Sequence, residues 1–349
     1  MEIVPGDFHG CQLPSEDAND AMVDGDIESM PGHFLCLEYP ASNNNCCRIT
    51  MYNVLVFLLV ILVVGGNETR GQSSDLSSLV QTERLFARTC GEKGIRASFL
   101  EFFADDAIAF LPEPANYKAA VKNRPAPDPR LVTLEWEPQA GGVASSGDIG
   151  YTTGPSVRTD NTAPGKPVHY GLYFSVWKKQ AGGTWKVAVD IGVSTPAQST
   201  RFGVPFKELK WRPFPIQHRE QLSTDGQATI MSLDTDLSKS CSSLGATEGY
   251  LSCVDNESML YCENSMPITG SDSIRAYLAN KSDTAAWHPL GGGISSAADL
   301  GYSYGSYEYA GGGSSVEKGY YLHVWKRTSP DSWKIVADVM NPIEPGDKK

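Results

Sequence analysis

The sequence predicts an α+β protein made of two similar domains, each with helices packed on one face of a curved antiparallel sheet. Three observations support this prediction. The chain has 349 residues, which suits two domains of about 120 residues with extensions. One part of the chain repeats the pattern of another. Within each copy, helical periodicity comes first and a series of strands follows, an order typical of α+β domains.

The repeat is clearest near the end of each copy. "GLYFSVWKKQAGGTWKVAVDI" at 171–191 and "GYYLHVWKRTSPDSWKIVADV" at 319–339 share eight residues at matching places. An offset of 151 residues aligns the copies from Cys90 to Gly154, and an offset of 148 aligns them afterwards. A repeat of this size indicates duplicated domains.

The elements of the first copy follow from hydrophobic periods and turn residues. Its helices are predicted at 74–89, 95–103 and 116–123. A short strand at 107–111 precedes the third helix, and four longer strands follow at 130–138, 147–159, 166–180 and 184–194. In the second copy, the third helix is expected to be capped by Ser271 or Asp272, since both residue types favour the N-cap.

The strand at 166–180 is apolar on both faces. Leu172, Phe174 and Val176 lie on one face, and Tyr173 and Trp177 on the other. Such a sheet must be covered on both sides, and the helices of one domain cover only one of them. We therefore expect the two domains to pair within the chain, sheet against sheet.

The predicted domains span 73–195 and 226–345. The segment between them, 196–225, is a linker whose four prolines and aromatic residues favour an ordered strap over a flexible chain.

The N-terminal region contains an apolar run of eleven residues, Val54–Val64. A membrane span needs about 20 residues, whereas this length is typical of a signal peptide. Residues 51–72 are therefore predicted to be a signal peptide, and 1–50 a disordered or mis-assigned extension. An uncleaved membrane anchor and a buried strand are the alternatives. The protein is expected to be secreted or periplasmic, or else anchored to a membrane through residues 54–64.

Charge and motif content narrow the classes of partner. The formal net charge of −12 is unsuited to neutralising phosphates, so nucleic acid is not an expected partner. The cysteine spacings match no zinc pattern, and the glycine run at 311–313 lacks the strand-to-helix context of a phosphate-binding loop. No cofactor or metal is expected.

The order of elements and several phrases carry a family resemblance. "GDIGYTTG", "ADLGYSYG", "YLHVWKR" and "WKIVADV" resemble SnoaL-like or DUF4440-type domains of the nuclear transport factor 2 (NTF2)-like superfamily. The resemblance implies a cone-shaped α+β domain that encloses an apolar pocket. Members include ketosteroid isomerases, polyketide cyclases, dehydratases and many non-catalytic modules, so the fold by itself decides no chemistry.

Three residues are candidates for proton transfer. Asp190 and Asp338 occupy the same place in the last strand of each copy, where apolar cone walls would raise the pKa of a carboxyl group. The alternative is a carboxylate balanced by a cross-strand lysine or arginine. His323 belongs to the second copy and has Ser175 as its counterpart. It is a candidate acid or base beside Tyr321, or else a structural histidine between the two sheets.

Six aromatic residues are candidates for lining the cone pockets. They are Trp136, Tyr151 and Tyr173 in the first copy and Trp287, Tyr302 and Tyr321 in the second. The tryptophans are suited to stacking on a ligand at the pocket mouth, or else to packing in the core.

The leading functional hypothesis is an exported protein that binds a small apolar or amphipathic ligand in one or both cones, without catalysis. The alternative is an isomerase, dehydratase or cyclase that uses a pocket carboxylate and a tyrosine. A second alternative is a protein-interaction module whose cones are filled by side chains. The sequence does not decide whether the protein is an enzyme.

Overall fold

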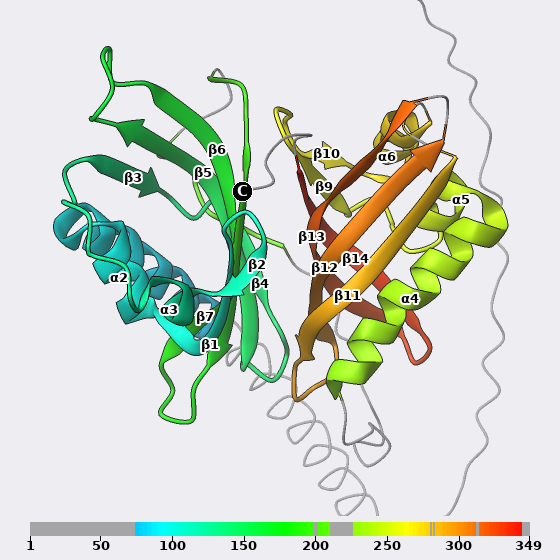
Figure 1. Ribbon diagram of the computed structural model, residues 1–349. Helices are drawn as coiled ribbons and strands as arrows, with labels where there is room; N and C mark the ends of the chain where they lie inside the picture. Colours follow the sequence, from blue (N-terminus) through cyan, green and yellow to red (C-terminus); the bar gives the residue numbers. More distant parts are fainter. Residues whose placement is uncertain are drawn as a thin grey trace, which may run out of the picture. The chain divides into compact units, whose positions relative to one another are not determined.

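The computed structural model describes residues 74–197, 202–209, 226–279, 281, 283–311 and 314–343. All of them belong to one compact unit, residues 57–349. The predicted extension and the apolar segment Val54–Val64 lie outside the described residues. Among the helices that are described, none has the length and apolar composition needed to cross a membrane. Figure 1 shows two sheets, each with helices on one face.

The first half, residues 74–209, has helices before strands, as predicted. A helix over 74–93 is followed by α2 (Ile95–Phe102) and α3 (Tyr117–Val121). The strands are β1 (Phe103–Phe110), β2 (Pro114–Asn116), β3 (Val132–Trp136), β4 (Ala140–Val143), β5 (Ile149–Asp160), β6 (Val168–Lys179), β7 (Trp185–Ser194) and β8 (Lys207–Glu208). Their order in the sheet is β2-β1-β7-β6-β5-β4-β8, and β3 also pairs with β5.

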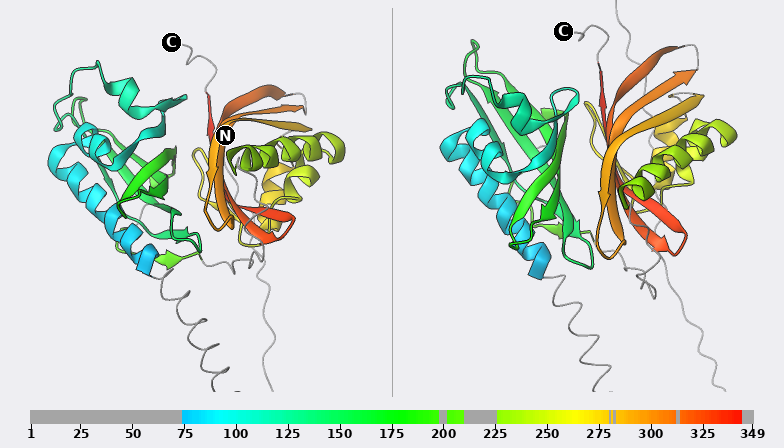
Figure 2. Two further views of the ribbon diagram at one scale, coloured as in Figure 1. Left: turned by 90° about the horizontal axis from the view of Figure 1, so that it is seen from below. Right: turned by 60° about the horizontal axis from the view of Figure 1, so that its bottom comes forward.

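The second half, residues 226–343, repeats this arrangement. Its helices are α4 (Gly226–Leu244), α5 (Ala246–Leu251) and α6 (Ser271–Leu278). Its strands are β9 (Met259–Cys262), β10 (Ile268–Thr269), β11 (Thr284–Ile294), β12 (Leu300–Gly311), β13 (Ser314–Ser329) and β14 (Ser332–Pro342). In the order β10-β9-β14-β13-β12-β11, the first five strands correspond to β2-β1-β7-β6-β5 of the first half, and β11 takes the place of β3 and β4. Two further views show the curvature of this sheet around α4 (Figure 2).

Three details differ from the sequence prediction. The sheets are mixed, because β1 runs parallel to β7 and β9 parallel to β14; hydrophobic period reveals a strand but not its direction. The strand predicted at 130–138 is β3, over Val132–Trp136, and the separate short strand β4 that follows it was not predicted. In the second half the equivalent stretch is one strand, β11, with an irregular register after Pro289. The N-cap of α6 is Gly270, while the Ser271 hydroxyl donates to Asn256 Oδ1 at 2.8 Å.

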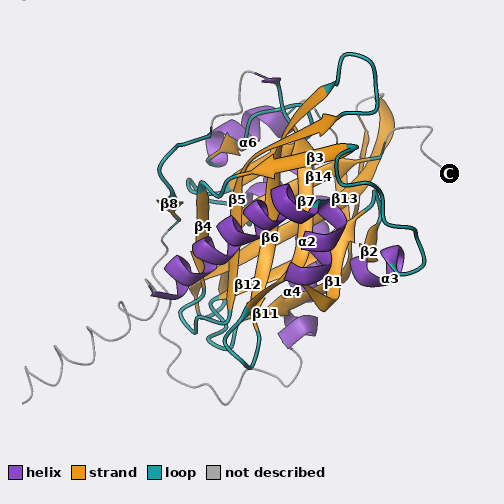
Figure 3. Cartoon of the chain, turned by 90° about the vertical axis from the view of Figure 1, so that its left-hand side faces the viewer, coloured by secondary structure: helices purple, strands orange, loops and turns teal. Residues whose placement is uncertain are grey.

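Each sheet has two buried faces, and the faces have different partners. Tyr173 and Trp177 pack against the helices of their own half, and Figure 3 shows α2 lying across this face. Phe174 and Val176 belong instead to a third cluster that draws residues from both sheets. Within it the rings of Phe174 and Tyr261 meet edge to face, with centroids 5.7 Å apart. The predicted packing of sheet on sheet is therefore confirmed.

Two turns exchange hydrogen bonds between the halves. The Ser145 N–H donates to Asp299 Oδ2 at 2.9 Å, and the Ser296 N–H donates to Asp148 Oδ2 at 2.9 Å. Each aspartate stands directly before the first residue of a long strand, β5 or β12, at equivalent places in the repeat. Each turn thus supplies the acceptor for a backbone N–H of the other, so the pair fixes the register of the two sheets.

Candidate functional site

The first half contains a cavity of about 360 Å³ between its sheet and its helices. Trp136, Phe86 and Phe99 form an aromatic wall: Trp136 meets the rings of the two phenylalanines edge to face at centroid distances of 4.8 and 6.3 Å. Tyr173 and Asp190 also line the cavity. We call this space, with the side chains that line it, the first cone.

Asp190 lies in the first cone beside Ser175. The two residues are cross-strand partners on β7 and β6, and the Ser175 hydroxyl donates to Asp190 Oδ2 at 2.7 Å. Asp190 is partly exposed, through the cavity that it lines. Burial raises the pKa of Asp190 to about 7, although the hydrogen bond from Ser175 opposes this shift.

The residue across from Asp190 on β6 is Ser175, and not the lysine or arginine considered as an alternative. Lys186, on the same strand as Asp190, donates its ammonium group to the Glu101 carbonyl oxygen at 2.5 Å. The carboxyl group of Asp190 therefore faces the cavity with a serine hydroxyl, and no cation among the described residues forms an ion pair with it.

Glu83 organises the aromatic wall and was not identified from the sequence. This fully buried residue accepts hydrogen bonds from the indole N–H of Trp136 at 2.6 Å, the Thr152 hydroxyl at 2.5 Å and the indole N–H of Trp177 at 3.0 Å. Burial raises the pKa of Glu83 to about 7, against the effect of these three hydrogen bonds. A signal was present in the sequence, because Glu83 falls on the helical stripe formed by Leu79 and the apolar residues after it.

The mouth of the first cone carries a pair of basic residues. Arg158 on β5 and His169 on β6 are cross-strand partners, and both line the cavity. The second half contributes Glu263 and Asn341 to the same lining. Glu263 Oε2 accepts the Ser194 N–H at 2.9 Å, so this carboxylate is held against the backbone of β7.

The equivalent cone of the second half, here the second cone, contains a buried chain of charged groups. His323 Nδ1 lies 2.8 Å from Asp234 Oδ1, and His323 Nε2 lies 3.4 Å from Asp338 Oδ2. The Tyr321 hydroxyl donates to Asp234 and the Tyr250 hydroxyl to Asp338, at 2.7 and 2.8 Å. The two carboxylates and the imidazole are all fully buried.

Opposing effects set the charge of His323. Burial alone would lower the pKa of the imidazole, but the carboxylates of Asp338 and Asp234 outweigh it and raise the pKa to about 9. His323 is therefore a buried imidazolium between two acidic groups. It does not lie between the sheets, as one sequence-based alternative placed it, because its strand face is the one that points at α4 and α5.

One substitution in the repeat explains why the two cones differ. Asp234 stands 151 residues after Glu83 and is one methylene shorter. The carboxylate of Asp234 forms an ion pair with His323, the counterpart of Ser175. The indole N–H of Trp287, the counterpart of Trp136, has no hydrogen-bond partner among the described residues.

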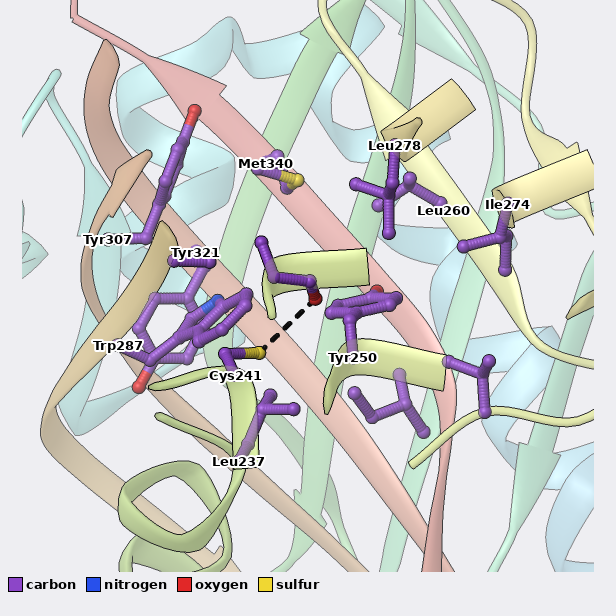
Figure 4. Close-up of a cluster of buried hydrophobic side chains, with 14 of the residues drawn as sticks. Leu237, Cys241, Tyr250, Leu260, Ile274, Leu278, Trp287, Tyr307, Tyr321 and Met340 are labelled. Atoms are coloured by element: carbon purple, nitrogen blue, oxygen red, sulfur yellow. Dashed lines mark hydrogen bonds between the residues drawn. The ribbon is translucent and has the colours of Figure 1, made fainter. Parts of the chain in front are cut away.

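Bulky side chains fill the second cone where the first has small ones. Tyr307, the cross-strand partner of Trp287, takes the place of Ser156, the partner of Trp136 in the first half. Met340, the cross-strand partner of Tyr321, takes the place of Gly192, the partner of Tyr173. Tyr307 and Met340 are each 1% exposed. Figure 4 shows both beside Tyr321 and Trp287 in the core of the second half.

A third replacement closes the mouth of the second cone. Tyr309 pairs with Ala285 where Arg158 pairs with Leu134. Tyr309 is 3% exposed, and its hydroxyl contacts the sulfur of Met340 at 3.9 Å. The second cone is thus packed with side chains along its length.

The structure separates the six aromatic candidates into three groups. Trp136 and Tyr173 line the first cone, and Trp287 and Tyr321 are buried in the packed second cone. Tyr151 and Tyr302 lie in the cluster between the sheets, so their placement in the cones was wrong. They occupy the opposite strand face, because the predicted strands alternate between the two buried sides.

Among the described residues, no group of three or more His, Cys, Asp or Glu side chains has the arrangement of a metal site. Cys90, Cys241, Cys253 and Cys262 are free thiols. The chemistry that the first cone offers is therefore hydrogen bonding and proton exchange at Asp190 beneath an aromatic wall.

No family model and no curated protein matches this chain. Solved structures do match. A ketosteroid isomerase-like protein from Erwinia carotovora atroseptica is 11% identical, covers 36% of this chain and 100% of its own, and has a TM-score of 0.30. An NTF2-like protein of unknown function from Shewanella oneidensis is 14% identical over 32% of this chain and 97% of its own, with a TM-score of 0.27. The CaMKII hub of S. rosetta is 17% identical over 35% of this chain and 95% of its own, with a TM-score of 0.27.

Proposed function

We propose that this chain, whose two halves are α+β cones of the NTF2-like type, binds a small amphipathic molecule in the first cone. The cavity of about 360 Å³ carries this proposal. Its volume lies within the range of about 300 to 1,000 Å³ typical of ligand pockets. An apolar wall with few polar groups is the usual composition of such sites, and the first cone combines its aromatic wall with Asp190 and Ser175.

The second cone supports the first. Its packed interior and its share of the cluster between the sheets stabilise the surface on which the first sheet rests. Of the two cones that the sequence offered for ligand binding, we therefore propose the first alone. The alternative of a cone filled by side chains applies to the second.

A transplant of the filling side chains tests the proposal. The double variant Ser156→Tyr and Gly192→Met, here the plug variant, gives the first cone the residues that fill the second. A Cβ at Gly192 would approach only the Leu172 carbonyl oxygen closely, at 3.1 Å, so the variant is expected to fold. Thr133→Tyr is the matched control, since it adds a tyrosine to an exposed position of β3.

The probe is the neutral dye 1-anilinonaphthalene, whose fluorescence rises in an apolar pocket. The wild type and Thr133→Tyr should bind it equally, and the plug variant should bind it at least tenfold more weakly. Native mass spectrometry of the wild type should show a co-purified molecule that the plug variant lacks. Equal dye binding by the plug variant and the wild type would contradict the proposal.

A second candidate function is proton transfer in the same pocket, as in an isomerase, dehydratase or cyclase. The raised pKa of Asp190 favours it, because a base with a pKa near the working pH is the most effective. For any turnover detected, Asp190→Asn should abolish the rate and leave dye binding within about threefold, a loss of less than 1 kcal/mol. An unchanged rate would remove Asp190 from the chemistry.

We also propose that the protein is exported. The apolar run Val54–Val64 and the small residues after it support this. Cleavage would be seen as an N-terminus near residue 72 in the mature protein, and a retained segment with membrane association would support the anchor instead.

A further inference from the structure

We propose that the ligand of the first cone is an elongated organic anion, whose acidic group is held at the mouth by Arg158 and His169. This inference rests on the function proposed above and adds the chemical class and the orientation of the ligand.

The geometry places the two basic residues together on the inner face of the sheet. Arg158 and His169 are directly opposite each other on β5 and β6, and opposite side chains on one sheet face have Cβ atoms about 5 Å apart. Both line the cavity. An arginine and a histidine at this separation can donate to the same carboxylate or sulfonate group.

The acidic groups nearby are already engaged. Asp160, two residues beyond Arg158, accepts from the backbone N–H and the hydroxyl of Thr162 at 2.9 and 2.6 Å. Glu263 is bound to the Ser194 N–H. Within the described ranges, no ion pair is formed by either Arg158 or His169. Asp160 interacts with Arg158 only at longer range than an ion pair. In a chain of net charge −12, two basic residues at a pocket mouth that form no ion pair within the described ranges suit an incoming anion.

The basic pair Arg158 and His169 is present in the first cone, which is open, and has no counterpart in the second cone, which is filled. The second half has Tyr309 in place of Arg158 and Glu317 in place of His169, paired across the same strands. Glu317 accepts from the Tyr307 hydroxyl at 2.9 Å and forms an ion pair with Lys281 at 3.0 Å. These groups satisfy one another, which fits a cone that receives no ligand.

The inner end of the cavity sets the orientation. Ser175 lies six residues after His169 on β6, so about 20 Å of strand separates the basic mouth from Asp190, at about 3.3 Å per residue. A second acidic group beside Asp190 would be repelled whenever Asp190 is ionised. The anion therefore faces the mouth, its apolar body lies along Trp136, and a hydroxyl or carbonyl group suits the inner end.

Two dyes with the same ring system test the inference. 8-Anilino-1-naphthalenesulfonate carries an anionic group, and 1-anilinonaphthalene does not. The wild type should bind the sulfonate about tenfold more tightly. Arg158→Gln should weaken binding of the sulfonate about fivefold and that of the neutral dye less than twofold, and 0.5 M NaCl should weaken only the sulfonate. Arg130→Gln is the charge-matched control, because it removes an exposed cation paired with Asp128 outside the cavity lining, and it should change neither affinity.

The outcomes separate the two levels of the argument. Equal affinities of the wild type for the two dyes, or an equal effect of Arg158→Gln on both, would overturn the anion assignment and leave the pocket in place. If neither dye binds, or if the plug variant binds both as the wild type does, the proposed function fails and the anion assignment fails with it.

Discussion

Replacement of His323 by glutamine should destabilise the protein at neutral pH and much less at high pH. The wild-type imidazolium lies between Asp234 and Asp338, at 2.8 and 3.4 Å, and all three side chains are fully buried. Its pKa is about 9 in the folded state against 6.5 for an ordinary histidine. At about 1.4 kcal/mol per pKa unit, this difference of 2.5 units contributes about 3 kcal/mol to the free energy of unfolding.

The direction of the pH dependence follows from the raised pKa. A group that binds its proton more tightly when folded stabilises the fold fully below the unfolded pKa of 6.5. That contribution is lost as pH rises through 9. His323→Gln removes the charge and leaves two buried acidic groups without a cation, a change that costs about 3 to 5 kcal/mol when one partner of a buried pair is lost.

Urea unfolding followed by tryptophan fluorescence measures this effect. The difference in unfolding free energy between wild type and His323→Gln should be about 3 kcal/mol at pH 6 and should fall to below about 1 kcal/mol by pH 10. Thr89→Val is the control, because it removes a buried hydroxyl that donates to the backbone carbonyl oxygen of Leu85, and it should show no such pH-dependent difference. A difference that is the same at pH 6 and pH 10 would refute the buried imidazolium.

Two further predictions concern stability. Burial raises the pKa of Glu83 from 4.5 to about 7, so ionisation of Glu83 should cost the wild type up to about 3 kcal/mol of unfolding free energy as pH rises from 4.5 to 7. Asp190, whose pKa is also raised to about 7, adds a loss in the same pH range. Glu83→Gln should therefore lose less stability than the wild type over this range in urea titrations, and an unchanged slope would assign the loss to other groups. Asp148→Ala and Asp299→Ala should each lower the unfolding free energy by about 1 to 3 kcal/mol, because a backbone N–H of the facing turn loses its acceptor. Thermal melting should show the larger loss of stability for the buried Asp299. If neither variant lost stability, water would be replacing the carboxylates as acceptors.

The strand pattern predicted the two-sided sheets, but the position of the site was only partly predictable. Alternation along 166–180 separated Tyr173 and Trp177 from Phe174 and Val176, as the structure has them. Alternation does not say which face meets the helices. For that reason Tyr151 was assigned to the wrong side, and His323 was left between two possible sides.

The buried acidic residues of the helices were missed for a different reason. Glu83 and Asp234 were not singled out in the sequence, although each lies on the buried side of its helix. Their stabilising partners, the tryptophans of the first cone and His323 of the second, come from strands 53 to 94 residues away. A single sequence shows that an acidic residue lies on the apolar side of a helix. Only the folded chain shows which distant groups donate hydrogen bonds to its buried carboxylate.

The contrast between the two cones has a consequence for the shape of a binding curve. Two identical cones would offer two equivalent sites, and a change of packing between their sheets could couple the sites and make binding cooperative. Because Tyr307, Tyr309 and Met340 occupy the second cone, the proposal places the ligand in the first cone alone among the described residues. Saturation should therefore follow a simple hyperbola at one ligand per chain, so that occupancy rises gradually with ligand concentration and without a threshold.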